Sequence, residues 1–388
     1  MLTLVFWLSL ALLFYIYLGY PLLASLLAQI RGLPISTDDS YQPTVTIVIA
    51  AYNEADSIEA TLNNKLELAY PDEKIEILVV SDESDDGTDS IVERVAQSSS
   101  RSIKLFRQVP RQGKTAGLNT LVANATGDII LFSDANSQWD QNAVNHLVSN
   151  FADDGVGYVT GKMVYVAADG SLVGDGCSTY MKYENWLRVK ESAIGSVVGV
   201  DGGIDGIRKS LYQSLRADQL PDFVQPLKVV EQGYRVIYEP RALLKEDANE
   251  DSVSEFSMRV RVSLRALWAL KDMAHLMNPF NYGLFALQMV SHKLLRYLAF
   301  VPLITFTVAA LLLAPRGGFY ALCFFGLVLL YAFGWLGRKG EERGRSSSFV
   351  YAVPYYFLLL NIASLKATMA FLKGEKKVVW NPRKARYR

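Results

Sequence analysis

The segment Asp134-Ala135-Asn136 places oxygen ligands directly after a short apolar run, residues 128–133. A buried parallel strand that ends on acidic residues delivers them to the carboxyl end of a sheet, where ligands of α/β domains bind. Carboxylate and amide oxygens suit hard cations such as Mg²⁺ and Mn²⁺, which share their coordination with substrate phosphates. The pattern predicts a divalent metal site, with a solvated turn as the alternative for this triplet taken alone.

Two further strand ends carry polar residues that could share a cleft with this triplet. Tyr52-Asn53-Glu54 follows the β-branched run 44–51, and Asp82 follows the run 75–80. A single Asp after a strand is most often a solvated turn. Three polar strand ends in successive strand–helix repeats instead predict one ligand site beyond the edge of the sheet.

Lys114 lies in Gly113-Lys114-Thr115, which is similar to a phosphate-binding loop but lacks its first glycine. That motif requires a glycine five residues before Gly113, and position 108 is Gln. We therefore exclude a P-loop and interpret Lys114 as a cation that reaches a diphosphate, with a solvated lysine as the alternative.

The elements that would position these residues alternate between strands and helices across residues 43–250. Strands are expected at 44–51, 75–80, 103–106 and 128–133, and helices at 56–68, 88–96 and 118–125. This alternation predicts an α/β fold with a mostly parallel sheet, helices on both faces and right-handed crossovers.

Uncharged apolar segments flank this region on both sides. Residues 2–30 are long enough to span a bilayer, and a cleaved signal peptide fits less well because no basic residue precedes the run. Three further apolar segments lie at 297–314, 319–336 and 349–365. The expected organisation is an anchor at 1–30, a soluble domain at 31–280, an amphipathic interfacial helix at 281–296, a transmembrane region of about three apolar segments at 297–372 and a basic tail at 373–388.

Composition narrows the class of function. The formal net charge is zero, so no basic field favours nucleic acid. Cys177 and Cys323 are far apart in sequence and Cys323 lies in an apolar segment, so neither a disulfide nor a zinc cluster is expected. A transporter is disfavoured because four apolar segments and a large soluble domain leave no room for inverted repeats.

Together these features resemble the processive, membrane-embedded branch of the family 2 glycosyltransferases, relatives of the cellulose, chitin and hyaluronan synthases. The resemblance covers nearly the whole chain. Val45–Glu54 is similar to the family's first strand and nucleotide-binding turn, Lys114 to its Lys-Ala-x-Leu-Asn element, and Asp134-Ala135-Asn136 to its Asp-x-Asp. Gly202–Arg208 resembles the acceptor-side glycine segment, and Leu220-Pro221-Asp222 stands where the family has Thr-Glu-Asp. The resemblance implies a GT-A nucleotide-diphospho-sugar transferase domain with transmembrane helices at both ends.

The resemblance also implies roles for individual residues. The catalytic base is expected to be Asp222, and the metal ligands Asp134 and Asn136. Nucleotide contacts are expected from Ala51, Tyr52, Glu54, Asp82, Lys114 and Arg261. Acceptor contacts are expected from Trp186, Gly202 and Asp205, with core packing of a helix as the alternative for Trp186 and turn capping for Asp205. Glu184 and Glu191 are interpreted as surface or structural residues.

Three positions depart from the family's pattern. Asn136 replaces the second carboxylate, so affinity for the metal is expected to depend more on the substrate's phosphates. Pro221 replaces the Glu beside the catalytic position. In Met258-Arg259-Val260-Arg261-Val262 only Arg261 survives of the family's Gln/Arg-x-x-Arg-Trp motif, and the Trp that would stack on an acceptor sugar is absent.

The function implied is inverting transfer from a UDP-sugar to a polysaccharide or glycan acceptor, with Mg²⁺ or Mn²⁺, in exopolysaccharide or cell-surface polysaccharide synthesis. Candidate partners are the lipid bilayer and accessory proteins of an export system. Activated sugars are made in the cytosol, so we expect a multi-pass protein of the cell (inner or plasma) membrane with a cytosolic catalytic domain. Two alternatives remain: non-processive transfer of one sugar to a lipid-linked acceptor, a polyprenyl phosphate or glycolipid, and a nucleotide-binding pseudoenzyme that acts as a scaffold.

The basic loop 337–348 is then expected inside, as the positive-inside rule prefers. Three carboxy-terminal crossings would leave the basic tail outside, in conflict with the same rule. A re-entrant or interfacial last segment would resolve the conflict.

Overall fold

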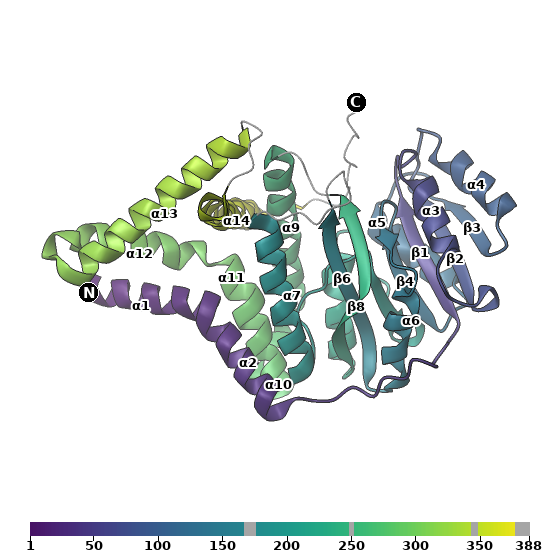
Figure 1. The fold of residues 1–388 in the computed structure, drawn as a ribbon, viewed down its shortest axis with the longest axis horizontal. Helices are drawn as coiled ribbons and strands as arrows, with labels where there is room; N and C mark the ends of the chain where they lie inside the picture. Colours follow the sequence, from purple (N-terminus) through teal and green to yellow (C-terminus); the bar gives the residue numbers. More distant parts are fainter. Residues whose placement is uncertain (167–175, 248–251, 343–347, 377–388) are drawn as a thin grey trace. The chain divides into compact units, whose positions relative to one another are not determined.

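The computed structural model of the chain describes residues 1–166, 176–247, 252–342 and 348–376 (Figure 1). These residues form two compact units. The sheet unit comprises the described residues of 32–172 and 191–247, and the helical unit those of 1–31, 173–190 and 248–376. Most of the basic tail predicted at 373–388 lies outside the described residues.

The sheet unit is built on one eight-stranded sheet with the order β3-β2-β1-β4-β7-β6-β8-β5. Its strands are β1 Val45–Ala51, β2 Ile75–Ser81, β3 Ser102–Arg107, β4 Ile129–Asp134, β5 Gln138–Trp139, β6 Val156–Val166, β7 Asp205–Arg208 and β8 Arg235–Asp247. The pairs β1–β2, β1–β4 and β2–β3 are parallel, which confirms the parallel half expected from the alternating pattern.

Register brings the predicted strand ends to one edge of the sheet. Ala50 of β1 pairs with Asp134 of β4, and Ala51 pairs with Ser81, the residue before Asp82. Parallel strands in register end together, so the polar residues that follow them share the carboxyl edge. The strands consist of consecutive buried residues, as both faces are covered.

The other half of the sheet contains antiparallel pairs. β7 runs antiparallel to both β4 and β6 and β5 runs antiparallel to β8, whereas β6–β8 is parallel. The sheet is therefore mixed, and four of the seven pairings between its described strands are parallel, in agreement with the predicted mostly parallel sheet. The four-residue strand β7 gave no apolar run in the sequence, because it begins on Asp205 and contains a glycine.

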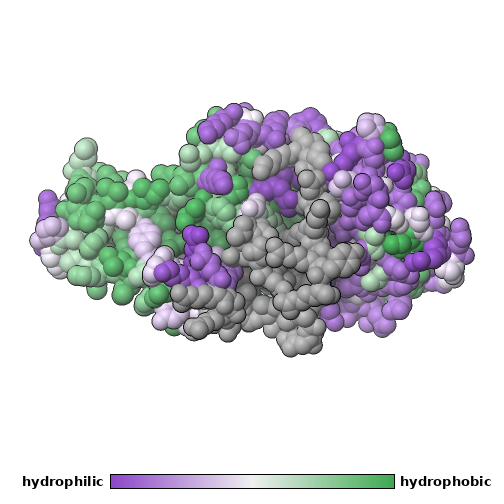
Figure 2. Space-filling model, turned by 90° about the horizontal axis from the view of Figure 1, so that it is seen from above, coloured by the Kyte–Doolittle hydropathy of each residue, from purple (hydrophilic) through white to green (hydrophobic). Residues whose placement is uncertain are grey.

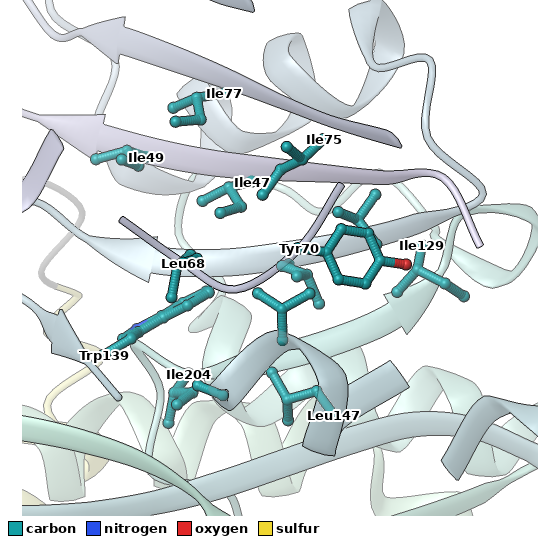
Figure 3. Packing of buried hydrophobic residues seen from close by; sticks show 14 of the residues in the cluster. Ile47, Ile49, Leu68, Tyr70, Ile75, Ile77, Ile129, Trp139, Leu147 and Ile204 are labelled. Atoms are coloured by element: carbon teal, nitrogen blue, oxygen red, sulfur yellow. The ribbon is translucent and has the colours of Figure 1, made fainter. Parts of the chain in front are cut away.

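Two apolar cores cover the two faces of the sheet. Figure 3 shows one of them, where Ile47 and Ile49 of β1 and Ile75 and Ile77 of β2 pack with Trp139. Residues of α3, α4 and α6 complete this core, while residues of α5 and α8 pack on the opposite face. The helices of this unit are α3 Ile58–Leu66, η2 Asp72–Lys74, α4 Thr88–Ser98, α5 Lys114–Asn124, α6 Ala143–Val148, η3 Ser149–Ala152, η4 Lys209–Leu211 and α8 Pro221–Glu231.

The helical unit gathers the apolar ends of the chain, and Figure 2 shows apolar residues spread over its surface. Three helices are long and apolar enough to cross a membrane: Leu2–Arg31, Gly318–Glu342 and Phe349–Leu372. The elements are α1 Leu2–Phe14, η1 Tyr15–Gly19, α2 Tyr20–Arg31, α9 Ser252–Asp272, η5 Ala274–Met277, α10 Pro279–Gln288, η6 Met289–Leu294, α11 Leu295–Tyr297, α12 Phe300–Leu313, η7 Ala314–Arg316, α13 Gly318–Glu342 and α14 Phe349–Leu372, with most of α7 Gly176–Ile194.

The first of the three expected carboxy-terminal spans is shorter than predicted. α12 has 14 residues, and Pro279–Tyr297 and Phe300–Arg316 reach the length and hydropathy of a span only as a pair, bent by 58°. The segment 281–296, expected as an interfacial helix, is the first arm of this bent pair. The bend follows Leu298, whose backbone departs from helical geometry.

The units also divide the chain differently from the expected boundary at residue 280. Residues 176–190 and 252–280 group with the apolar helices rather than with the sheet. The physical reason is visible for α9, where Leu264 and Leu267 are buried against Ala367 of α14.

Candidate functional site

Three predicted site residues meet at the carboxyl edge of the sheet. Lys114 Nζ donates to Asp134 Oδ1 at 2.6 Å and lies 3.6 Å from Asp222 Oδ2. The side chains of these three residues are between 29% and 40% exposed. The lysine therefore links two carboxylates that come from different elements, and all three groups remain open to a ligand.

A glycine turn packs closely over both carboxylates. Gly202 and Gly203 have φ values of +76° and +74°, a region that L side chains rarely adopt. A Cβ atom at Gly202 would lie 3.1 Å from Asp222 Cγ, and one at Gly203 would lie 3.3 Å from Asp134 Oδ2. Side chains at these positions would crowd the two carboxylates. The glycines let the backbone approach these carboxylates closely, in the segment that the sequence predicted to face the acceptor.

Helix α3 fixes the loop that follows Asp134. Thr61 Oγ1 donates to the Ala135 carbonyl at 2.8 Å, and Lys65 Nζ donates to the Ser137 carbonyl at 2.8 Å. Lys65 is completely buried, and burial lowers the pKa of its amine well below the ordinary value. Trp139 then donates from its indole to the Gly203 carbonyl at 2.8 Å, so one loop positions both the acidic residue and the glycine turn.

Helix α5 positions the segment that leads to Asp222. Thr115 Oγ1 donates to the Gln219 carbonyl at 2.9 Å, and Asn119 Nδ2 donates to the Leu215 carbonyl at 2.7 Å. Asp222 itself lies in the first turn of α8, where the helix dipole stabilises a carboxylate. Lys114 begins α5, so the same short helix carries the cation and anchors the base.

Asp82 is buried and holds the loop before α5. Its carboxylate accepts from the backbone N–H of Gln112 at 2.8 Å and of Gly113 at 3.0 Å, from Arg111 Nε at 3.2 Å, and from the Gln108 side chain. Asp82, predicted to contact the nucleotide, thus serves here as an anchor for the segment that presents Lys114.

Arg111 covers the aromatic face of Tyr52. Its guanidinium carbon lies 3.3 Å from the ring centroid, a cation–π contact at short range. Tyr52 follows Ala51, which is buried at the end of β1. A planar group that stacks on the same face of this tyrosine has to replace the arginine.

The turn after Tyr52 is joined to the turn after β2. Asn53 Nδ2 donates to Asp85 Oδ1 at 2.8 Å, and the Glu54 backbone N–H donates to Thr88 Oγ1 at 3.0 Å. Glu54 Oε2 accepts from Ser57 Oγ at 2.8 Å. Burial raises the pKa of Glu54, and the charge of nearby Asp134 adds to this shift.

Asp205 does not lie where an acceptor could touch it. It is 1% exposed in β7, where it pairs in register with Phe132 and Thr160. Burial raises the pKa of its carboxyl to about 8, with the charges of Asp222 and Asp201 adding to the effect. The expected contact with acceptor hydroxyls does not fit this burial. Turn capping, the alternative, stays a prediction, because Asp205 is the first residue of β7 and follows the glycine turn.

The residues at Asp134 fit a metal that also binds the substrate. Asn136 is exposed beside it, and among the described residues no three Asp, Glu, His or Cys side chains are grouped so as to hold a metal ion. A cation such as Mg²⁺ commonly takes one or two carboxylates and completes its coordination with phosphates and water. Asp134 and Asn136 offer one carboxylate and one amide oxygen, which suits a cation that also binds phosphates and water.

The remaining predicted residues belong to the helical unit. Arg261 lies on α9, and Trp186 lies on α7 with its side chain 39% exposed. Core packing, the alternative for Trp186, does not match this exposure. The roles predicted for both residues stay predictions.

Sequence reasoning missed the residues that hold the site in place. The described structure adds Arg111 and Gln108 at Asp82, Thr61 and Lys65 under the acidic loop, and Asn119 beneath the base-bearing segment. Asn119 had a signal, since it ends the Lys-Ala-x-Leu-Asn element. The α3 residues had none, because their partners are more than 70 residues away.

Part of the chain is similar to known proteins. Residues 46–199 match the family model described as glycosyl transferase family 2. Among curated proteins, the chain is 28% identical over 205 residues to the poly-beta-1,6-N-acetyl-D-glucosamine synthase of Staphylococcus aureus, covering 51% of this chain and 48% of that protein. It is 28% identical over 219 residues to the probable glycosyltransferase YdaM of Bacillus subtilis, covering 54% and 51%. The chain spans about half the length of these relatives.

A solved structure resembles nearly the entire chain. The mannosyltransferase PcManGT from Pyrobaculum calidifontis, in complex with GDP-Man and Mn²⁺, aligns with a TM-score of 0.74 and 23% identity. The alignment covers 97% of this chain and 100% of that one. The likeness shows that the two proteins share a fold.

Proposed function

We propose, on the premise that the chain carries a glycosyltransferase domain of family 2, that it transfers a sugar from a UDP-sugar, with inversion, to a glycan acceptor at the membrane. The observation that carries the proposal is the placement of Lys114 Nζ against both Asp134 and Asp222. A cation beside two open carboxylates suits a reaction in which a diphosphate leaves and a hydroxyl loses its proton.

Asp222 is the general base in this mechanism. The acceptor oxygen forms its bond to the anomeric carbon while the bond from that carbon to the phosphate oxygen breaks. The diphosphate leaves with the electron pair, and the acceptor's proton passes to the Asp222 carboxylate. A single displacement of this kind inverts the configuration, and it depends on the base being held in position, as the anchors on α5 do here.

Lys114 and Asp134 act on the donor's diphosphate. Lys114 supplies positive charge to the leaving group, where preorganised charge has its largest effect. A divalent metal held by Asp134, with Asn136 beside it, would neutralise the phosphates as a Lewis acid when bound. PcManGT forms its complex with GDP-Man together with Mn²⁺, which supports the use of a divalent cation of this kind.

The nucleotide lies, in this proposal, against Tyr52 and the Arg111 side chain that stacks on it. The base is uracil by the family resemblance, whereas the solved neighbour holds GDP-Man. The donor therefore has to be measured with both nucleotides in the same panel.

The setting is membrane-bound polysaccharide synthesis with the catalytic unit in the cytosol. The name of the Staphylococcus aureus relative describes a polymer of N-acetylglucosamine, and three helices of this chain have the length and hydropathy of spans. A polysaccharide chain and an export system are the acceptor and partners that this setting favours.

A second candidate is transfer of one sugar to a lipid-linked acceptor. Val262 stands where the related synthases have the Trp that stacks on an acceptor sugar, so one platform for holding a growing chain is absent. Product length distinguishes the two candidates, because a processive enzyme yields a ladder of products and the alternative yields one.

The test uses the purified full chain with a panel of UDP-sugars and GDP-mannose, in Mg²⁺ and in Mn²⁺. We expect release of UDP from at least one UDP-sugar, dependent on the metal. Turnover of GDP-mannose alone would overturn the choice of nucleotide, and tight binding of donors without turnover would favour a pseudoenzyme scaffold.

A further inference from the structure

The turn that carries both predicted metal ligands, residues 134–137, is fixed at three points. The backbone N–H of Ser137 donates to the Asp134 carbonyl at 3.3 Å, which closes the segment as in a β-turn. Thr61 and Lys65 of α3 donate to the carbonyls of the two residues on either side of Asn136, both at 2.8 Å. The side chain of Asn136 therefore starts from a backbone that α3 holds on both sides. We call residues 134–137 the ligand turn.

Lys65 makes its contact with an amine that has no acidic partner among the described residues. The side chain is completely buried. Its hydrogen bonds go to two neutral oxygens, Asn64 Oδ1 at 2.9 Å and the Ser137 carbonyl at 2.8 Å, and its Nζ lies 4.4 Å from the centroid of the Trp139 ring. Lysine is almost never fully buried unless it is paired with an opposite charge. The residue type therefore needs a reason other than packing.

The buried amine of Lys65 opposes folding. Water solvates the amine in the unfolded chain, and its removal from water lowers the pKa of Lys65 well below the ordinary value. Below the ordinary pKa of a lysine, the folded chain therefore binds this proton less tightly than the unfolded chain does, which lowers the stability of the folded state at neutral pH. The Trp139 ring and the two neutral oxygens offset part of this penalty. An apolar side chain of the same length would not incur it.

The contacts of Lys65 also lead to the glycine turn that packs against Asp222. Trp139, whose ring lies against the amine, donates from its indole to the Gly203 carbonyl at 2.8 Å. Asn64 holds the backbone of the tryptophan, because it donates to the Trp139 carbonyl at 2.9 Å and accepts from the Trp139 N–H at 2.8 Å. One lysine on α3 thus contacts the ligand turn and the residue that positions the glycine turn.

We propose that Lys65 is a positioning residue for donor binding, which holds the ligand turn in the geometry that receives a divalent cation and a diphosphate, and that it does so at a cost to the stability of the fold. The inference rests on the proposed function, because that function assigns the ligand turn to the donor's diphosphate. A lysine kept for packing alone would stabilise the fold. The two roles therefore predict opposite changes in stability when the amine is removed.

The experiment compares the parent chain with Lys65→Met, which keeps the length of the side chain and removes its amine. Thermal melting of the metal-free full chain in detergent should give a midpoint equal to or above that of the parent, because no amine is buried. Electron paramagnetic resonance of free Mn²⁺ in the presence of UDP should give an affinity about fivefold to tenfold lower, because one hydrogen bond that fixes the ligand turn is lost.

Two matched variants separate positioning from packing. Thr61→Val removes the other donor to the ligand turn with little change of shape, and it should weaken Mn²⁺ binding about threefold to fivefold. Val92→Ala opens a small cavity in the apolar core that α3 and α4 share. It should lower the melting midpoint and leave the affinity for Mn²⁺ within about twofold of the parent, because Val92 makes no hydrogen bond to the ligand turn.

Either half of the expected result can overturn the positioning role. A melting midpoint of Lys65→Met that falls as far as that of Val92→Ala would do so, and a Lys65→Met chain that does not fold counts as the same outcome. Unchanged Mn²⁺ affinity would also do so. Donor kinetics add a further readout: KM for the donor should rise about fivefold to tenfold with kcat changed by less than about twofold. A fall in kcat with KM unchanged would contradict a role in donor binding.

Melting and Mn²⁺ binding require no turnover, so failure of this inference can be told apart from failure of the proposed function. A parent chain that binds Mn²⁺ with UDP, responds to Lys65→Met as expected and transfers no sugar refutes the proposed function alone. Sugar transfer by the parent together with unchanged Mn²⁺ binding by Lys65→Met refutes the positioning role alone. A parent chain that does not bind Mn²⁺ with UDP refutes both.

Discussion

Each unit of the molecule holds a cluster of ionisable side chains, and the two clusters differ in their access to solvent. In the sheet unit, Lys114, Asp134 and Asp222 are 29–40% exposed. In the helical unit, Glu184, His292 and Arg296 are between 2% and 14% exposed.

The difference shows what each cluster can do. A half-open cluster keeps oxygen atoms for a new ligand, and its charges contribute little to stability because water screens them. A buried cluster has already exchanged water for its partners, so removing one member leaves an uncompensated charge. The first arrangement suits chemistry on a changing set of ligands, and the second suits holding helices in one register.

The largest expected effect is a loss of sugar transfer when the open cluster is broken. Asp222→Asn removes the base and should lower kcat/KM for sugar transfer by about 10²- to 10⁴-fold, with the dissociation constant for UDP nearly unchanged. Asp218→Asn is the matched control, since Asp218 precedes α8 and pairs with Arg216. Retained transfer in Asp222→Asn would remove Asp222 from the mechanism.

Breaking the buried cluster should affect folding instead. Glu184→Gln leaves Arg296 and His292 without their carboxylate and should destabilise the chain by about 3–5 kcal/mol. Glu342→Gln breaks the exposed Arg338 pair and should change stability by less than about 1 kcal/mol. Thermal midpoints of the two variants are measured in the same detergent, and we expect the lower midpoint for Glu184→Gln. Similar midpoints would show that the buried cluster contributes no more to stability than the exposed pair.

A buried acid next to the open cluster predicts a dependence of stability on pH. The pKa of Asp205 is raised from 3.8 to about 8, so between these values the folded chain binds a proton that the unfolded chain has lost. Its contribution to stability is complete below about pH 4 and falls by at most about 1.4 kcal/mol for each unit as the pH rises to 8.

Thermal midpoints from pH 5 to pH 8 test this dependence on Asp205. Asp205→Asn should flatten the profile, whereas Asp128→Asn, at an exposed position, should leave the slope of the parent chain. Parallel slopes for the parent and Asp205→Asn would contradict a neutral carboxyl in the strand.

The smallest expected effect is a change in Mn²⁺ affinity that tests the role of Asn136. Without nucleotide, the chain should bind Mn²⁺ only weakly, with a dissociation constant on the order of 1 mM, because few protein oxygens are available. Adding UDP should tighten binding, and Asn136→Asp should tighten it without UDP. Electron paramagnetic resonance of free Mn²⁺ measures both, and tight binding to the nucleotide-free parent would contradict the shared site.

The sequence predicted the open cluster much better than the buried one. Asp134 lies at the end of a strand that is predicted by its apolar run. Lys114 and Asp222 lie in short motifs that resemble those of a family. The bounds of strands β1 to β4 were predicted to within about two residues, whereas helix α5 begins at Lys114 rather than at residue 118.

What the sequence did not predict depends on contacts between distant segments. Glu184 was interpreted as surface or structural, and its partners lie 108 and 112 residues away. The antiparallel strand β7 is too short to leave a pattern, and the bend between Tyr297 and Phe300 is not marked by a Gly or Pro at the break itself. Local patterns predict elements, but pairing over such distances follows from packing.

The π turn at Tyr15–Gly19 has a consequence for the evolution of the chain. A π turn is equivalent to one residue inserted into an α-helix, and each residue of an α-helix turns the chain by about 100°. Deleting a single residue there would restore a regular helix and rotate Tyr17 away from the cavity of about 350 Å³ that it lines together with residues of α7, α9 and α14. The cavity thus depends on the length of the first helix as well as on its residue types, and its loss in a related protein would be recorded as a one-residue gap.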